Sequence, residues 1–289
     1  MQLKFLLNLL LAFPVSCGAQ KVTVMTPDNN LKSELAQTIA GRNVDTAKAL
    51  AHRMPPGDAG AVLQDMAANQ RSSIRLLVLD IASEVPSEGA SRAILSRLQD
   101  ADLTVRAVAN SLIGSCAQKS IVPDLFAAMD QNEDLLAKGA MARQIGTIGD
   151  SGDLPRLRER YNKARDPQLR DDLAAAMARL GDERSRNVVV RRLSDSEVDA
   201  RVKALHDIEY IGDPRLARHF RPVLEDQREA IAISPPHDPR VSARVCDVAA
   251  GSLTALGVPL SFRALPLRRL SEPEIQEALQ RVMSLENAQ

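Results

Sequence analysis

The order of apolar and polar residues along this 289-residue chain is typical of short amphipathic helices. The clearest example is the stretch DPQLRDDLAAAMARLGD, from Asp166 to Asp182. Asp166 is a residue type that caps helices, and Pro167 suits a first helical turn. Apolar residues then recur every three or four positions with alanines between them, which predicts one buried helix face made of Leu169, Leu173, Met177 and Leu180. Gly181 tolerates the left-handed conformation that commonly ends a helix, so the helix is expected to stop there.

The same layout returns about every 32 residues, which indicates a repeat array. A basic residue marks one position in five successive copies, at spacings of 31, 32, 32 and 31: Arg75, Arg106, Lys138, Arg170 and Arg201. We call these five residues the basic ladder. Four residues before each of the last four stands an acidic residue suited to a helix start: Asp102, Asp134, Asp166 and Glu197. Three of the helices are followed by a Gly-Asp pair, whose acidic members are Asp150, Asp182 and Asp213.

A second helix in each copy carries its own apolar positions in the same register. One set comprises Ile94, Leu125, Leu157, Val189 and Phe220, and the other Leu98, Met129, Tyr161, Leu193 and Leu224. A degenerate first copy has Val44 in place of the basic residue. A pair of short helices cannot bury both apolar stripes alone, so the pairs are expected to stack as a one-dimensional array with caps at its ends.

These patterns divide the chain into four parts. Residues 1–19 are predicted to be a signal peptide, and residues 20–42 an N-terminal segment with a capping helix. Residues 43–257 are predicted to form about seven repeats, with an inserted loop at 227–240. Residues 258–289 are predicted to carry a C-terminal capping helix.

The segments TVRAVANSLIG, LAKGAMARQIGTIGD and ARVKALHDIEYIGDPRLA resemble HEAT repeats, in the short form called the phycobilisome-lyase HEAT-like repeat. The resemblance covers roughly residues 43–257 and implies an all-α fold, a right-handed α-solenoid of stacked antiparallel helix pairs with the second helices lining the concave face. It also implies that the basic ladder, from Arg106 onward, and the Asp of each Gly-Asp pair bond between neighbouring repeats. Gln118 departs from this pattern, because it stands where the turn after Gly114 would carry the Asp.

The composition and the N-terminal residues indicate where the protein is located. The chain has 37 Lys plus Arg and 37 Asp plus Glu, so its net charge gives no attraction to nucleic acid or to anionic lipid. Lys4, a short apolar run from Phe5 to Phe13 and small residues before Gln20 resemble a cleaved export signal that is too short to span a bilayer. The mature protein is therefore expected in the periplasm or outside the cell. An alternative is a lipid anchor on Cys17.

The two remaining cysteines are expected to be free and buried. Cys116 and Cys246 lie four repeats apart, and stacked helices are spaced by about 8–10 Å. Their separation should be tens of ångströms, against the roughly 4.4–6.8 Å between Cα atoms that a disulfide requires.

No catalytic or metal-binding constellation is evident, so we expect no cofactor and no enzymatic activity. HEAT enzymes that oxidise a lysine-derived side chain hold two irons with repeated His-Glu pairs, and this sequence has no His-Glu dipeptide. The nearest approaches are His206-Asp207 and His237-Asp238. A metal-dependent oxidoreductase or hydroxylase, or a lyase, stays open as an alternative function.

Basic residues on the second helices form the candidate binding surface. They are Arg156, Arg160, Lys163, Arg186, Arg191, Arg192, Arg215, Arg218 and His219. The alternative is a solvated face, because acidic neighbours offset these charges. The inserted loop adds Pro235, Pro236, His237 and Asp238. We expect an exported, non-enzymatic scaffold that binds a protein or peptide partner through its concave face and this loop; a purely structural envelope component is a further alternative. Few aromatics accompany the arginines, which disfavours single-stranded nucleic acid as the ligand.

Overall fold

The computed structural model describes residues 27–230, 243–264 and 268–287. The structure is all-α in these ranges, and the only strand-like feature described is an isolated bridge between Glu229 and Arg244. A helix α1 (Pro27–Ala40) lies where the sequence predicts the N-terminal cap. Residues 1–19 and the loop residues Pro235 to Asp238 lie outside the described ranges, so the signal-peptide and loop predictions remain predictions.

Pairs of helices follow α1 in regular order. The first helices of the pairs are α2 (Val44–Arg53), α4 (Ser72–Glu84), α6 (Leu103–Ser111), α8 (Leu135–Ile148), α10 (Pro167–Arg179), α12 (Val198–Ile211) and α14 (Val245–Ala255). The second helices are α3 (Pro56–Met66), α5 (Glu88–Leu95), α7 (Val122–Gln131), α9 (Leu154–Lys163), α11 (Glu183–Arg191), α13 (Arg221–Leu224) and α15 (Glu272–Asn287). Short 3-10 helices adjoin several of them, among them η4 (Arg192–Ser194) and η5 (Pro214–His219).

The predicted capping residues begin the first helices. The side chains of Asp102, Asp134 and Asp166 each accept a hydrogen bond from a backbone N–H of the first turn. Glu197 occupies the same position of α12, but its side chain makes no such bond. Gly181 and Gly212 follow their helices with φ of 100° and 70°, a conformation that glycine adopts without strain.

The apolar positions of the second helices form the core between neighbouring pairs. Ile94, Leu125, Leu157, Val189 and Phe220 are fully buried. In the other set Leu98, Met129, Leu193 and Leu224 are buried, and Tyr161 is partly buried. The predicted helical phase of the repeat is therefore correct.

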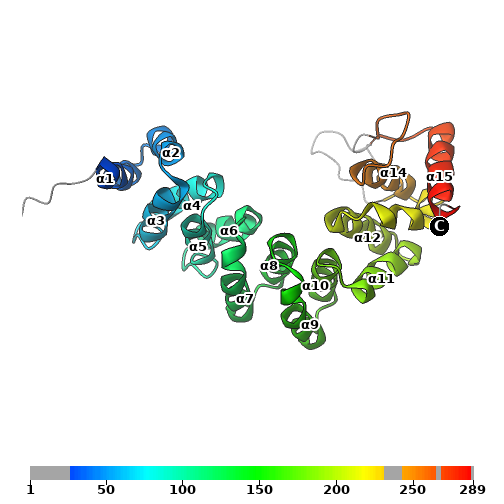
Figure 1. Cartoon of the computed structure of the whole chain (residues 1–289), viewed down its shortest axis with the longest axis horizontal. Helices are drawn as coiled ribbons and strands as arrows, with labels where there is room; N and C mark the ends of the chain where they lie inside the picture. Colours follow the sequence, from blue (N-terminus) through cyan, green and yellow to red (C-terminus); the bar gives the residue numbers. More distant parts are fainter. Residues whose placement is uncertain (1–26, 231–242, 265–267, 288–289) are drawn as a thin grey trace, which may run out of the picture.

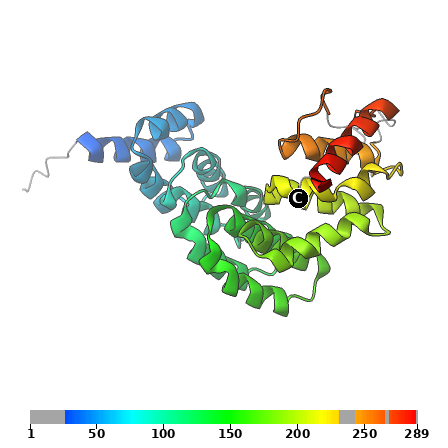
Figure 2. The ribbon, with the colours of Figure 1, turned by 45° about the vertical axis from the view of Figure 1, so that its right-hand side comes forward.

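The stacked pairs form an arch (Figure 1), and its sides differ from the sequence-based expectation. The first helices α8, α10, α12 and α14 lie on the inner side, and α7, α9 and α11 lie on the outer side, as the rotated view in Figure 2 also shows. The prediction that second helices line the concave face is therefore wrong. Small residues accompany the close approach of α8 and α10 on the inner side, where a Cβ on Gly146 would lie 2.8 Å from the Cα of Ala176.

The apolar core is divided in two within α10. One cluster of buried apolar residues extends from Leu35 to Met177, and the other extends from Ala178 to Val282. We call the boundary between α10 and α12, where the two clusters meet, the seam.

Candidate functional site

The most concentrated polar chemistry on the inner side joins three successive first helices. Arg143 of α8 donates from Nε to Asp172 of α10 at 2.8 Å and pairs through Nη2 with Asp207 of α12. Lys203 Nζ lies 3.4 Å from Asp172 and 3.3 Å from Asp207. The Tyr210 hydroxyl donates to the carbonyl oxygen of Arg143. We call these five residues the inner cluster.

Small residues make the inner cluster possible. Ala174, Ala175 and Ala176 of α10 are buried beneath it. A Cβ on Gly139 would overlap the carboxylate of Asp172, and a Cβ on Gly146 would lie 2.8 Å from the Cα of Ala176 and overlap the Tyr210 hydroxyl. The glycines of α8 therefore provide the space in which the charged side chains and the tyrosine meet.

The inner cluster is buried and its charges balance. Asp207 is 0 % exposed and Asp172 is buried, while Arg143 and Lys203 are partly buried. Burial alone would lower the pKa of Arg143, but the charges of Asp207 and Asp172 outweigh it and raise that pKa. Burial raises the pKa of Tyr210 to about 12, so its hydroxyl stays protonated and donates. These groups pair with one another, which is the arrangement of a structural ionic network.

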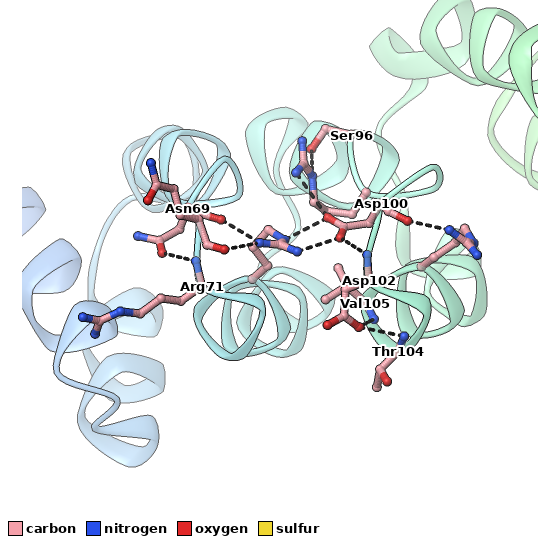
Figure 3. Close-up of polar contacts among 11 residues, drawn as sticks. Asn69, Arg71, Ser96, Asp100, Asp102, Thr104 and Val105 are labelled. Atoms are coloured by element: carbon pink, nitrogen blue, oxygen red, sulfur yellow. Dashed lines mark hydrogen bonds and ion pairs between the residues drawn. The ribbon is translucent and has the colours of Figure 1, made fainter.

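The basic ladder forms a second kind of buried site, at the loops between pairs. Arg75 donates from Nε and Nη2 to Asp100 at 2.8 and 2.7 Å, and from Nη1 to the carbonyl oxygens of Asn69 and Gln70 at 2.9 Å. Figure 3 shows the polar contacts that tie Asn69 and Arg71 on one side to Asp100 and Asp102 on the other. A bidentate arginine-carboxylate pair whose Nη1 also bonds two carbonyl oxygens fixes the position of a loop.

Other members of the basic ladder repeat part of this geometry. Arg106 and Arg201 each donate to a carbonyl oxygen six residues earlier, those of Asp100 and Asp195, at 2.6 Å. Arg201 also lies 3.1 Å from the carboxylate of Asp226. Arg170 instead lies over the Tyr161 ring, 4.8 Å from its centroid. For Lys138 no ion pair is seen within the described part of the chain.

The acidic members of the Gly-Asp pairs do bond to the preceding pair of helices, but to residues outside the basic ladder. Lys119 pairs with Asp150, Arg158 lies 2.7 Å from Asp182, and Arg186 lies 3.6 Å from Asp213. Each Asp also accepts a backbone N–H at the start of the following helix. A bond between the basic ladder and these acids is therefore not how neighbouring repeats are joined.

Among the basic residues predicted to bind a partner, those of α9 and α11 lie on the outer side, and most of the set have partners within the chain. Arg156 and Arg160 stack on Phe126 at 3.9 and 4.6 Å from the ring centroid, and Arg160 also pairs with Asp130. Further contacts join Lys163 with Glu159, Arg186 with Glu183, Arg192 with Asp171, Arg215 with Asp213, and Arg218 with His219. Arg191 is exposed. The predicted set therefore does not lie together on the inner side, because Arg156, Arg160, Lys163, Arg186 and Arg191 belong to the outer helices α9 and α11.

The two cysteines and the histidines that the structure describes lie at separate places in the fold. Cys116 and Cys246 are free and buried, and burial raises the pKa of each to about 11, so both stay protonated thiols. His206 is exposed, and the neighbouring Asp207 is committed to the inner cluster. Burial, followed by the charge of Arg218, lowers the pKa of His219. Over the described residues, no three His, Cys, Asp or Glu side chains are placed to hold a metal ion together.

A hollow of about 400 Å³ lies beside the last member of the basic ladder. Its lining includes Arg201, Asp226 and Arg228. These side chains bond to one another and to nearby carbonyl oxygens, as Arg228 does with Asp226 and with the Ser196 carbonyl oxygen at 2.7 Å. The hollow is therefore lined by groups that already have partners.

Large apolar side chains are exposed at one end of the first helices. Leu103 begins α6, and Leu135 and Leu136 begin α8; their exposed fractions are 70 %, 45 % and 67 %. Val44 occupies the same first position of α2 and is exposed as well. Because first helices stack side by side in the same direction, these residues lie along one edge of the inner layer, which we call the leucine edge. Sequence analysis missed this edge, although a leucine directly after a capping Asp points away from the core stripe.

Comparison with known proteins bears on the fold. Residues 91–178 match the family model for HEAT repeats. No curated protein matches the chain in sequence. None of the helices within the described ranges combines the length and hydrophobicity needed to cross a bilayer.

Three solved structures that resemble the chain are distant in sequence. One is the complex of CpcE and CpcF of phycocyanin lyase from Nostoc sp., at 16% identity and a TM-score of 0.46, covering 97% of this chain and 99% of that one. Another is human deoxyhypusine hydroxylase, at 12% identity and a TM-score of 0.32, covering 91% and 98%. An engineered protein matches at 14% identity and a TM-score of 0.31, covering 89% and 98%.

The repeating helix pairs, their shared apolar register and the matching family model lead to one conclusion about fold. Within its described residues this chain has the all-α helical fold of HEAT repeats, and residues 91–178 match the model of that family.

Proposed function

We propose that this chain is a non-enzymatic scaffold, exported from the cytoplasm, that binds a protein or peptide partner along its leucine edge. The observation that carries the proposal is the exposure of Leu103, Leu135 and Leu136 on two neighbouring first helices. A partner with its own apolar side chains would remove this surface from water, which stabilises a complex by roughly 25 cal/mol per Å² of apolar area buried. Repeat arrays commonly use such extended surfaces for binding.

The chemistry of the other sites supports a binding role over catalysis. The inner cluster uses its charges on one another, and both described thiols are held protonated by burial. Binding energy is therefore available at the leucine edge, while the titratable groups stabilise the fold. Export is supported by the composition of residues 1–19 alone.

A crosslinking experiment tests the binding surface. The full chain, expressed in its source organism, carries a photoreactive amino acid at Leu136, and a control variant carries it at Met283, an exposed apolar residue of α15. We expect one defined crosslinked partner from position 136, lost in the variant Leu103→Ser with Leu135→Ser. Equal crosslinking from both positions, or none from position 136, would contradict the leucine edge as the binding surface.

Cell fractionation tests export separately. The tagged full chain is expected outside the cytoplasm and shortened by about 19 residues, as a cleaved signal predicts. Deleting residues 1–19 should leave the protein in the cytoplasm. An uncut, cytoplasmic full chain would refute the export part of the proposal while leaving the binding surface untouched.

A further inference from the structure

The buried apolar residues on the two sides of the seam belong to two separate clusters. Within α10, Met177 packs with the N-terminal cluster and Ala178 with the C-terminal cluster. Repeat arrays transmit stability through the interfaces between neighbours. An interruption of the apolar core therefore marks a position where the two halves of the arch can turn relative to each other.

Polar and charged contacts cross the seam. Arg143 and Lys203 each contact both Asp172 and Asp207. Arg192 of η4 pairs with Asp171 of α10. Arg179 donates to the carbonyl oxygen of Tyr210, whose ring lies between Arg143 and Arg179 at 4.9 and 5.0 Å from their guanidinium carbons. Charged groups from both sides of the seam thus contact one another.

One contact differs in kind from the other ion pairs of the molecule. Arg143 and Asp207 are 64 residues apart and belong to pairs that are two positions apart in the array. The bonds of Lys48 with Glu84, of Arg92 with Asp124 and of Arg158 with Asp182 each join neighbouring pairs. A contact that passes over α10 closes only when α8 and α12 lean towards each other, so its formation depends directly on the angle of the bend.

We propose that the inner cluster holds the seam closed, and that releasing it lets the two halves of the arch open about α10. The inner cluster acts as an electrostatic lock on a hinge between two apolar bodies. The buried Asp207 makes the lock two-state, because a carboxylate without its arginine in this position must either become solvated or stay unpaired at high cost. This inference concerns the shape of the arch, and it holds whether or not the leucine edge binds a partner.

Distance measurements between spin labels on the two sides of the seam test the lock. Labels are placed on Ala107→Cys in α6 and His206→Cys in α12, both exposed positions, in the full chain carrying Cys17→Ser. Cys116 and Cys246 are buried and stay unlabelled. In Arg143→Met we expect the mean label distance to lengthen by roughly 5 Å or more, the scale of helix shifts in structural switches, and its distribution to broaden.

Two controls separate opening of the seam from general loosening. Arg92→Met removes an ion pair of 2.9 Å between neighbouring second helices and should leave the same label distance unchanged. In the Arg143→Met protein, labels on Ala49→Cys in α2 and Ala107→Cys, which lie on one side of the seam, should also keep their distance. An unchanged distance across the seam in a folded Arg143→Met protein would overturn the proposal.

A more conservative substitution tests the same proposal if the Arg143→Met protein does not fold. Asp207→Asn keeps the size of the side chain and removes the charge that Arg143 pairs with. Its circular dichroism should match that of the unchanged chain, and its label distance across the seam should lengthen. A folded Asp207→Asn protein with the original distance would likewise refute the lock.

Discussion

The loop site around Arg75 and the inner cluster are both buried networks of arginine and aspartate, but they connect different parts of the array. Arg75 bonds to Asp100 of its own helix pair and to carbonyl oxygens of the loop before it. Arg201 and Asp226 repeat this arrangement in another pair. The inner cluster spans three pairs and is found once within the described residues.

The difference shows how a repeat protein combines regularity with a particular shape. Contacts that recur in more than one pair, such as those of Arg75 and Arg201, stabilise individual repeats and leave the shape of the array uniform. A contact between pairs two positions apart constrains curvature at one place. The regular sites therefore stabilise the repeats, and the inner cluster sets the curvature of the arch at the seam.

Removing an apolar side chain from the regular part gives the largest expected loss. Leu157 of α9 is fully buried between neighbouring pairs, so Leu157→Ala should reduce the free energy of unfolding by about 2–5 kcal/mol. Urea denaturation measures the loss. Leu136→Ala, at a mostly exposed leucine, should change the free energy by less than about 0.5 kcal/mol. Equal effects of the two substitutions would mean that the apolar register is misassigned.

The bend is tested by filling the space between α8 and its neighbours. Gly146→Ala places a methyl group against the backbone of Ala176 and the Tyr210 hydroxyl, so we expect a loss of about 1–3 kcal/mol from overpacking. Gly114→Ala is the control, because a Cβ there meets nothing within 4 Å. Thermal and urea denaturation of both variants measure the difference. A neutral Gly146→Ala would show that the close approach of α8, α10 and α12 is not required.

The repeated features of the fold could be predicted from the sequence, because residues of the same type recur at the same spacing. The caps Asp102 and Asp134 and the buried Leu157 follow from spacing and from residue type. It misplaced the inner side, because which layer faces inward depends on the summed sizes of many side chains. It also missed the inner cluster, although one signal exists: Asp207 is the sixth residue after its ladder arginine, and that position is Ile81 in α4 and Ala176 in α10.

Removing a helix-capping side chain should give a smaller loss of stability. The same capping position can be compared in two repeats. Asp102 accepts hydrogen bonds from the backbone N–H groups of Thr104 and Val105, so Asp102→Ala should cost about 1 kcal/mol. Glu197 stands at the equivalent position of α12 without a capping bond, so Glu197→Ala should be nearly neutral. Denaturation curves in urea resolve the two values. A larger loss for Glu197→Ala would contradict the structure of that helix start.

Acid should weaken the loop sites with a predictable sign. Burial alone would raise the pKa of Asp100, but the hydrogen bonds from Arg75 and from the Asp102 amide lower it below the ordinary 3.8. The Arg228 hydrogen bond likewise lowers the pKa of Asp226. A carboxyl with a lowered pKa stabilises the fold above its ordinary pKa and loses that stabilisation as the pH falls through its folded value. The free energy of unfolding should therefore fall below about pH 4, and less steeply in Asp100→Asn.

The seam contains a carboxyl with the opposite dependence. Burial raises the pKa of Asp171 despite the nearby charge of Arg192. Its charged form is thus less favourable in the folded protein than in the unfolded chain, and protonation relieves that cost as the pH falls. Asp171→Asn should therefore steepen the acid loss that Asp100→Asn reduces. The same direction of change in both variants would contradict this contrast between loop site and seam.

The central claim is that the inner cluster couples the two apolar halves of the arch, and hydrogen exchange measured by mass spectrometry on the full chain tests it most directly. In the unchanged protein, peptides from α8 and α12 should exchange with the same free energy of opening, because the inner cluster links them across α10. In Arg143→Met the two values should separate, while Arg92→Met leaves them together. If the two values stay equal in a folded Arg143→Met protein, the coupling lies elsewhere and the account of the bend is wrong.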